Sequence, residues 1–195
     1  MFVFEEREMS ILTDTVPKIF ISYAQANEEI RNGVIDLATA LREKGINAIL
    51  DLWDLKPGQD KFAFMEQCVK DDSMDYVLII CDKIYKDKAD NRIGGVGDET
   101  VIITPEVYND VRQEKFIPIV FERDDNGHEY LPIYLKSRIY IDLSTKNENY
   151  DDEFEKLLRI IHKKPLYKKP PIGKMPEYLN NENISYGDLN LLKKK

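Results

Sequence analysis

The chain has 195 residues, of which 43% are hydrophobic and 10% aromatic, so it is long enough and apolar enough to bury a core. Its formal net charge of −8 argues against general nucleic-acid binding, which needs a surplus of lysine and arginine. No segment has the ~18 apolar residues that a membrane-spanning helix needs, and residues 1–10 lack the basic start and apolar stretch of a signal peptide. We therefore expect a soluble, cytoplasmic protein with no membrane or nucleic-acid partner.

The chain begins with a lead, residues 1–16, to which no regular structure is assigned. The run KIFISY at 18–23 then predicts a buried strand. Asn27 is placed to cap a helix with two glutamates in its first turn, and Gly45 ends that helix. A second strand is predicted over 46–52.

The next segment, WDLKPGQD at 53–60, is a polar loop in which a proline–glycine pair predicts a turn. Apolar residues at helical spacing predict an amphipathic helix over 61–71. The uninterrupted apolar run YVLIIC at 76–81 predicts a strand that is covered on both faces. Residues 83–101 are polar and contain three glycines, which indicates a loop.

Beyond this loop the pattern predicts a short helix over 105–113, a fourth strand over 116–121 and an edge strand over 138–143. Pro118 in the fourth strand indicates a bulge or a position near the edge of the sheet. The last predicted helix has an acidic first turn and a basic last turn, which suits the helix dipole, and Pro165 ends it.

Strands that alternate with helices predict a three-layer α/β fold, in which helices cover both faces of a five-stranded parallel sheet of flavodoxin-like order. We expect one domain over residues 17–165, between the N-terminal lead and an extended tail rich in proline and lysine at 166–195. Ligands of such sheets bind beyond the carboxyl ends of the strands, near the point where the strand order reverses. The loops at 22–26 and 53–60 are therefore expected on the same rim of the sheet.

The cysteines and histidines do not form a chemical centre in the sequence. Cys68 and Cys81 both fall in apolar segments, which favours two buried, reduced thiols over a disulfide. His128 and His162 have no second ligand at metal-binding spacing, so no metal is expected. Neither histidine has a nucleophile nearby in a supporting context, which argues against an ordinary hydrolase triad.

Four stretches together resemble the bacterial SEFIR branch of the Toll/interleukin-receptor (TIR) superfamily: KIFISYA at 18–24, ILDLWDLKPGQD at 49–60, FMEQCVKDDSMDYVLIIC at 64–81 and KADNRIGGVGDET at 88–100. The resemblance covers residues 17–165 and implies a TIR-like sheet. It also implies self-association through surface loops, or association with other TIR or SEFIR proteins. As in many bacterial and plant relatives, it further implies cleavage of NAD+ at the nicotinamide–ribose bond, with NAD+ as substrate and no cofactor.

One well-placed carboxylate suffices for this reaction, because positive charge develops on the ribose while a neutral nicotinamide leaves. The candidate is Glu66, on the flank of the helix over 61–71. Relatives that cleave NAD+ look similar here, with a glutamate often four residues after a tryptophan. This chain departs from that pattern, because Phe62 takes the place of the tryptophan. A register shifted by one helical turn would put Lys70 or Phe62 at the position of the glutamate. The structural alternative for Glu66 is a solvated carboxylate on a helix edge.

Six residues are expected around the substrate on the same rim: Ser22, Tyr23, Trp53, Lys56, Lys61 and Phe62. Ser22 and Tyr23 end the first strand, where a ribose or phosphate would approach, and the two lysines would meet the pyrophosphate. Trp53 is the one tryptophan of the chain and would stack on a base or on the nicotinamide ring. The structural alternatives are core packing for the tyrosine, packing against a helix for the tryptophan, and solvation for the lysines.

A non-catalytic homotypic interaction module is the other interpretation, as in animal cytokine receptors and their adaptor. The expected interface residues are Trp53, Leu55, Pro57, Gly58, Arg92 and Glu99, of which the last two are candidates for ion pairs. The two interpretations are compatible, because a neighbouring copy can complete an active site. A phospho-receiver domain shares the sheet order but needs an acidic pair after the first strand, where this chain has Ser22 and Tyr23. A role in signalling or bacterial defence follows from the resemblance alone.

Overall fold

The structure is a computed structural model that describes residues 16–25, 27–92, 114–145, 147–176 and 179. Within these residues five strands form one sheet: β1 (Lys18–Ser22), β2 (Asn47–Ile49), β3 (Tyr76–Cys81), β4 (Phe116–Val120) and β5 (Ile141–Asp142). Their order is β2-β1-β3-β4-β5, and every neighbouring pair is parallel. The predicted five-stranded parallel sheet of flavodoxin-like order is thus confirmed, with its switch point between β1 and β3.

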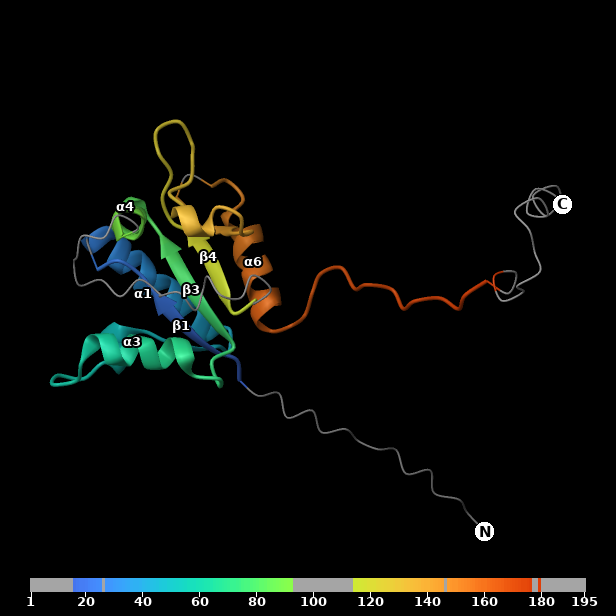
Figure 1. Cartoon of the computed structure of the whole chain (residues 1–195), viewed down its shortest axis with the longest axis horizontal. Coiled ribbons are helices and arrows are strands. Elements are labelled where there is room, and N and C mark those ends of the chain that lie inside the picture. The colour runs from blue at the N-terminus through green and yellow to red at the C-terminus, as the bar shows by residue number, and fades with distance from the viewer. Residues whose placement is uncertain (1–15, 26, 93–113, 146, 177–178, 180–195) are drawn as a thin grey trace, which may run out of the picture. The chain divides into compact units, whose positions relative to one another are not determined.

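Helices cover both faces of this sheet (Figure 1). The described helices are α1 (Glu28–Glu43), α2 (Asp51–Asp54), α3 (Lys61–Lys70), α4 (Lys83–Arg92), α6 (Tyr150–Ile161) and a 3-10 turn, η1 (Ile133–Leu135). One core cluster joins Leu41 of α1 and Leu157 of α6 to Ile21 of β1. Because successive strand residues face opposite sides, Phe20 enters the other cluster, with Met65 of α3. The three-layer expectation is therefore confirmed.

Two of the predicted helix ends have the expected geometry. The Asn27 side chain accepts a hydrogen bond from the Ile30 N–H at 2.7 Å and so caps α1. Gly45, which follows α1, has a φ of 80°, a conformation that glycine adopts without strain. Cys68 and Cys81 are buried free thiols, as the sequence predicts, and burial raises the pKa of Cys68 to about 11.

The second strand is shorter than predicted. The sequence predicts a strand over 46–52 followed by a loop, whereas β2 ends at Ile49 and Trp53 lies in the one-turn helix α2. The cause is local: the Asp54 carboxylate accepts a hydrogen bond from the Leu50 N–H at 2.9 Å, and the Asp51 carboxylate accepts one from the Leu52 N–H at 2.9 Å. Such side-chain bonds to the backbone compete with a strand ladder.

The segment after β3 was predicted to be a loop, and its first ten residues instead form α4, Lys83–Arg92. An Asp82 oxygen accepts a hydrogen bond from the Tyr85 N–H at 2.5 Å, in the position of a helix cap. Ion pairs one turn apart, Lys83 with Asp87 and Lys86 with Asp90, support the helix. The polar composition that suggested a loop is therefore that of an ion-paired helix. The predicted helix over 105–113 lies outside the described residues.

Pro118 does not interrupt β4, although β4 lies between β3 and β5. The N–H of Phe121 bonds to β3, and the carbonyl of Val120 accepts from the Leu143 N–H on the β5 side. Since alternate residues of a strand point to opposite neighbours, position 118 points toward β5. The described pairing with β5 begins only at Ile119, so the N–H that proline lacks has no ladder partner to lose. The expected bulge or edge position is therefore not found, because β4 is an inner strand that pairs with β3 in continuous register.

The last predicted strand also shortens: 138–143 was expected, and β5 spans Ile141–Asp142. The residues from Pro165 onward form a second unit, separate from the unit Met1–Lys164. Within the second unit, residues 165–176 are exposed and contain no helix or strand.

Candidate functional site

Hydrogen bonds join the loop after β1 to the helices that follow β2. Gln25 donates from its side-chain nitrogen to the Asp51 carboxylate, and its side-chain oxygen accepts a hydrogen bond from the Lys61 ammonium at 2.9 Å. Asp51 is only 7% exposed, whereas the Lys61 ammonium is near the surface. The chain Asp51–Gln25–Lys61 thus fixes a lysine at the carboxyl-end rim of the sheet. We call these three residues the rim group.

Ser22 and Tyr23, the predicted residues at the end of β1, lie beneath this rim. Both are buried, and the Ser22 hydroxyl has no hydrogen-bond partner among the described residues. Tyr23 packs in the core on the α1 side of the sheet, so its ring has the structural role given above as an alternative. Burial, and then the negative charge of Asp51, raise the pKa of Tyr23, which keeps its hydroxyl protonated.

Several apolar side chains of α2 and α3 are exposed near the rim. Trp53 is 44% exposed, Leu52 42% and Phe62 37%. Leu55, one of the expected interface residues, is half-buried. The loop that follows contains the predicted turn, because the Lys56 N–H bonds to the Gln59 side chain at 2.7 Å. Gly58 in this turn has a φ of 91°, and Lys56 and Pro57 are exposed beside it.

Glu66 lies on the exposed side of α3, whereas Met65 and Cys68, which flank it in the sequence, are buried. Its carboxylate pairs with the Lys70 ammonium at 2.6 Å, one helical turn away. In the described part of the chain it has no polar contact with the rim group. The predicted interface residue Glu99 and the side chain of Arg92 lie outside the described residues.

Asp82 follows β3, the strand next to β1, and is only 1% exposed. One of its oxygens caps α4, and the other has no partner among the described residues. Burial raises the pKa of Asp82, and the nearby Glu122 carboxylate acts in the same direction. This carboxyl therefore holds its proton more tightly in the folded protein than in the unfolded chain.

Asp82→Asn tests this carboxyl through the pH dependence of stability. The folded-state pKa lies above the unfolded value of about 3.9, so the folded protein holds this proton more tightly. Its contribution to the free energy of unfolding is therefore lost as pH rises from about 4 toward neutral. Over that range we expect the unfolding free energy of Asp82→Asn to rise relative to that of the original chain. Urea unfolding at several pH values measures this difference. A pH-independent difference would contradict the raised pKa.

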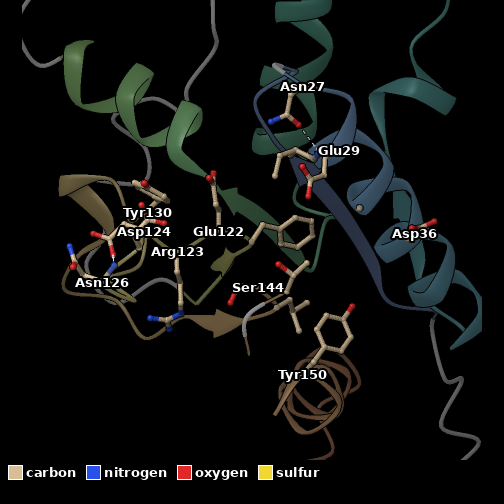
Figure 2. Close-up of a pocket in the computed structure, with 16 residues that line it drawn as sticks. Asn27, Glu29, Asp36, Glu122, Arg123, Asp124, Asn126, Tyr130, Ser144 and Tyr150 are labelled. Carbon is tan, nitrogen blue, oxygen red and sulfur yellow. Dashed lines mark hydrogen bonds between the residues drawn. The ribbon is translucent and has the colours of Figure 1, made fainter. Parts of the chain in front are cut away.

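A cavity of about 550 Å³ lies beyond the carboxyl ends of β4 and β5, away from the rim group at the ends of β1 and β2 (Figure 2). Its walls come from α1, from the loop after β4, from the loop after β5 and from the first residue of α6. The side chains that line it include five carboxylates: Glu29, Asp36, Glu122, Asp124 and Asp125. No pattern in the sequence predicts this cavity.

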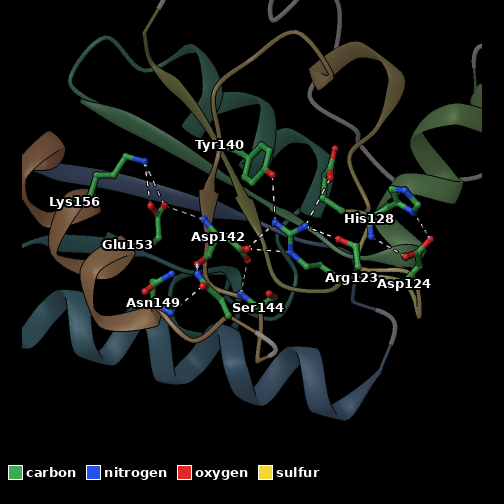
Figure 3. Close-up of polar contacts among 12 residues, drawn as sticks. Arg123, Asp124, His128, Tyr140, Asp142, Ser144, Asn149, Glu153 and Lys156 are labelled. Atoms are coloured by element: carbon green, nitrogen blue, oxygen red, sulfur yellow. Dashed lines mark hydrogen bonds and ion pairs between the residues drawn. The ribbon is translucent and has the colours of Figure 1, made fainter.

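Arg123, in the loop after β4, connects that loop to β5 (Figure 3). Its guanidinium donates two hydrogen bonds to one Asp142 oxygen, at 3.0 and 2.7 Å, and one to the Gly127 carbonyl at 2.7 Å. The Tyr140 hydroxyl accepts a further bond at 3.3 Å, and Asp142 is joined to α6 by its N–H, which donates to Glu153. This network holds the loop that forms one wall of the cavity.

Replacing Arg123 by methionine is expected to cost about 1.5–3 kcal/mol of unfolding free energy, because it removes charge-assisted bonds to a carboxylate that is largely buried. Equilibrium unfolding in urea measures the change. Lys156→Met is the matched control, since its pair with Glu153 is more exposed and should contribute at most about 1 kcal/mol. Equal losses in the two variants would mean that the Arg123 network adds no more than a surface pair.

Within the described ranges, no group of three or more histidine, cysteine, aspartate or glutamate side chains is arranged to hold a metal ion. Among the same residues, no helix has the length and apolar character to span a bilayer.

Comparisons with known proteins place the chain among others of the same fold. The family model for the TIR domain matches residues 19–158. The crystal structure of a prokaryotic SEFIR domain is 45% identical, with a TM-score of 0.64, and the match covers 80% of this chain and 99% of that one. No curated protein matches the chain.

Two more distant structures are also similar to the chain. The TIR domain of the Toll-related receptor TRR-2 from the lower metazoan Hydra magnipapillata is 20% identical, with a TM-score of 0.51, over 73% of this chain and 96% of that one. The TIR domains of the activated Roq1 resistosome, which directly recognises the pathogen effector XopQ, are 15% identical, with a TM-score of 0.48, over 74% and 99% of the two chains.

Proposed function

The chain belongs to the TIR domain family, in its SEFIR branch, and from this premise we propose that it is a cytoplasmic signalling or defence domain that self-associates and cleaves NAD+ at the nicotinamide–ribose bond. The reaction consumes water: the C–N bond breaks, its electron pair leaves with nicotinamide, and the water oxygen bonds to the ribose carbon and releases a proton. The products of this hydrolysis are nicotinamide and ADP-ribose. In a cyclising variant of the reaction an adenine nitrogen of the same molecule bonds to the ribose carbon in place of water, and no water is consumed.

The observation that supports this proposal most directly is the rim group. Asp51, Gln25 and Lys61 are tied by hydrogen bonds beside the end of β1, next to the switch point of the sheet, where ligands of doubly wound folds bind. Lys61 uses one donor on Gln25 and has others for an anionic pyrophosphate. The Ser22 hydroxyl, unpaired among the described residues, is a candidate donor to a ribose oxygen.

The exposed aromatic side chains supply the apolar part of the proposed site. Trp53 and Phe62 present faces on which an adenine or nicotinamide ring can stack. Lys56, exposed in the turn that follows α2, is a second candidate contact to phosphate. Glu66 remains the proposed catalytic carboxylate. For Glu66 to act, its ion pair with Lys70 must open, or the carboxylate must face a substrate held by a second copy.

The test is nicotinamide release from NAD+ by the full chain, measured at increasing protein concentration and after artificial clustering on a scaffold. Release well above the uncatalysed rate, reduced in Lys61→Ala while the thermal melt is unchanged, supports the proposal. No release from the clustered protein would remove the enzymatic half of it. Lys136→Ala is the matched control, since it removes an exposed lysine outside the rim group.

A non-catalytic interaction module is the second candidate, and the exposed apolar surface of α2 and α3 favours it. Leu52, Trp53 and Phe62 together offer a hydrophobic contact next to the exposed Pro57 and Gly58. Self-association without any nicotinamide release would favour this interpretation.

A further inference from the structure

The cavity at the ends of β4 and β5 shares no residue with the rim group, and it has its own charge pattern. Carboxylates line it on two sides: Glu29 extends from α1, and Glu122, Asp124 and Asp125 come from the loop after β4 (Figure 2). Of the described lysines and arginines, Arg123 alone lines it.

The positive charge of Arg123 is already compensated, because its guanidinium binds Asp142 and approaches Glu129. Asp124 is partly engaged too, since it accepts hydrogen bonds from the N–H groups of Asn126 and His128. The remaining lining carboxylates leave a negative field in a partly enclosed recess, where charges attract more strongly than in open water.

Part of the remaining lining is apolar. Phe121 and Leu143 contribute to it, with Ile30 of α1 beside them. Gly33 of α1 faces the ring of Phe121: a Cβ at this position would lie 3.4 Å from the ring edge, at ordinary contact distance. The result is an apolar strip with a carboxylate wall at each end.

A second observation points to a ligand. Ser144, in the loop after β5, lines the cavity and is 1% exposed, and its hydroxyl has no hydrogen-bond partner among the described residues. Buried hydroxyls are normally paired, because an unsatisfied one costs free energy. A donor group bound in the cavity would satisfy it.

We propose that this cavity binds a linear aliphatic polyamine. Such a molecule carries ammonium groups separated by short methylene chains, which matches carboxylates on two walls with an apolar strip between them. Its ammonium groups are donors only, so they suit carboxylate and serine oxygens. The volume of about 550 Å³ falls in the range of small-molecule sites. The proposal concerns this cavity alone and does not rest on NAD+ cleavage.

Calorimetric titration of the full chain with spermidine tests the proposal, with 1,8-octanediol as an uncharged probe of similar length. We expect one saturable site for spermidine and none for the diol. The double variant Glu29→Gln/Asp125→Asn removes one carboxylate from each wall and is expected to weaken binding by about tenfold or more, from the loss of two ion pairs.

The matched control is Glu43→Gln/Asp72→Asn, which changes the net charge equally at exposed positions outside the cavity. Its affinity for spermidine should stay within about twofold of the original. Equal weakening in both double variants, or the absence of a saturable site, would overturn the proposal and indicate general attraction to an acidic protein.

Gly33→Leu adds a filling test, because its side chain would enter the cavity beside Phe121. Binding should be lost in this variant. If circular dichroism shows that it folds and spermidine still binds with the original affinity, the ligand site lies elsewhere.

Discussion

In a clustered sample, Glu66→Gln is expected to lower the rate of nicotinamide release by about 100-fold or more while leaving the fold intact. The glutamine keeps the size of the side chain but removes the negative charge that would stabilise the developing ribose cation, and losing one such electrostatic group typically costs that much. The substitution is at an exposed helix position, so thermal unfolding should change little. Nicotinamide release at saturating NAD+ is the measurement.

Three further variants test whether Glu66 is the carboxylate responsible for nicotinamide release. Lys70→Ala removes the ion-pair partner of Glu66 and should keep or raise the activity. Asp51→Asn changes the rim group, and we expect it to raise KM more than it lowers kcat, because Asp51 acts through Gln25 on Lys61.

Glu99→Gln is the third comparison. Glu99 belongs to the fourth stretch that resembles the family, in the segment between α4 and β4. If the large loss follows Glu99→Gln and not Glu66→Gln, the catalytic carboxylate lies in that segment, and Glu66 is an ordinary helix-edge residue.

The sheet order was predictable because its signals are local and strong. The apolar runs at β1, β3 and β4 match the strands closely, and the alternation with helices leaves few topologies. The failures are equally local. Two aspartates after β2 turn the chain into α2 through bonds to the backbone, and a polar segment becomes α4 through a cap and ion pairs. Hydrophobic periodicity reports neither effect.

The candidate site was predictable only in part. Lys61 and the end of β1 were placed on one rim from the sheet order, and the hydrogen bond from Lys61 to Gln25 agrees with that placement. Gln25 and Asp51 were missed because their contact joins residues 26 apart in the chain. One signal was available: Asp51 is a polar residue two positions after the end of β2, and the β1–β2 register, extended by two residues, puts it opposite Ser22. The acidic cavity has no such signal, since its lining comes from four separate segments.

Activity per molecule is expected to rise steeply with protein concentration, and Trp53→Ala is expected to shift that rise to concentrations about 30-fold higher. The reason is that Trp53 is a large, exposed aromatic on α2, beside the turn at 56–59 and near the rim group. A contact there by a second copy would bury it, and truncating a central aromatic of an interface commonly costs 2 kcal/mol or more, which is ~30-fold in affinity.

Sedimentation velocity and nicotinamide release over the same concentration series measure both effects. Tyr167→Ala, which removes an exposed aromatic from the second unit, is the control and should leave both curves unchanged. Flat activity per molecule across a broad concentration range, with a monomer throughout, would show that the domain works without assembly. Association that weakens in Trp53→Ala, together with activity restored by artificial clustering, would instead assign the tryptophan to the contact between copies and not to the substrate. That last comparison separates the two roles that the sequence left open for this residue.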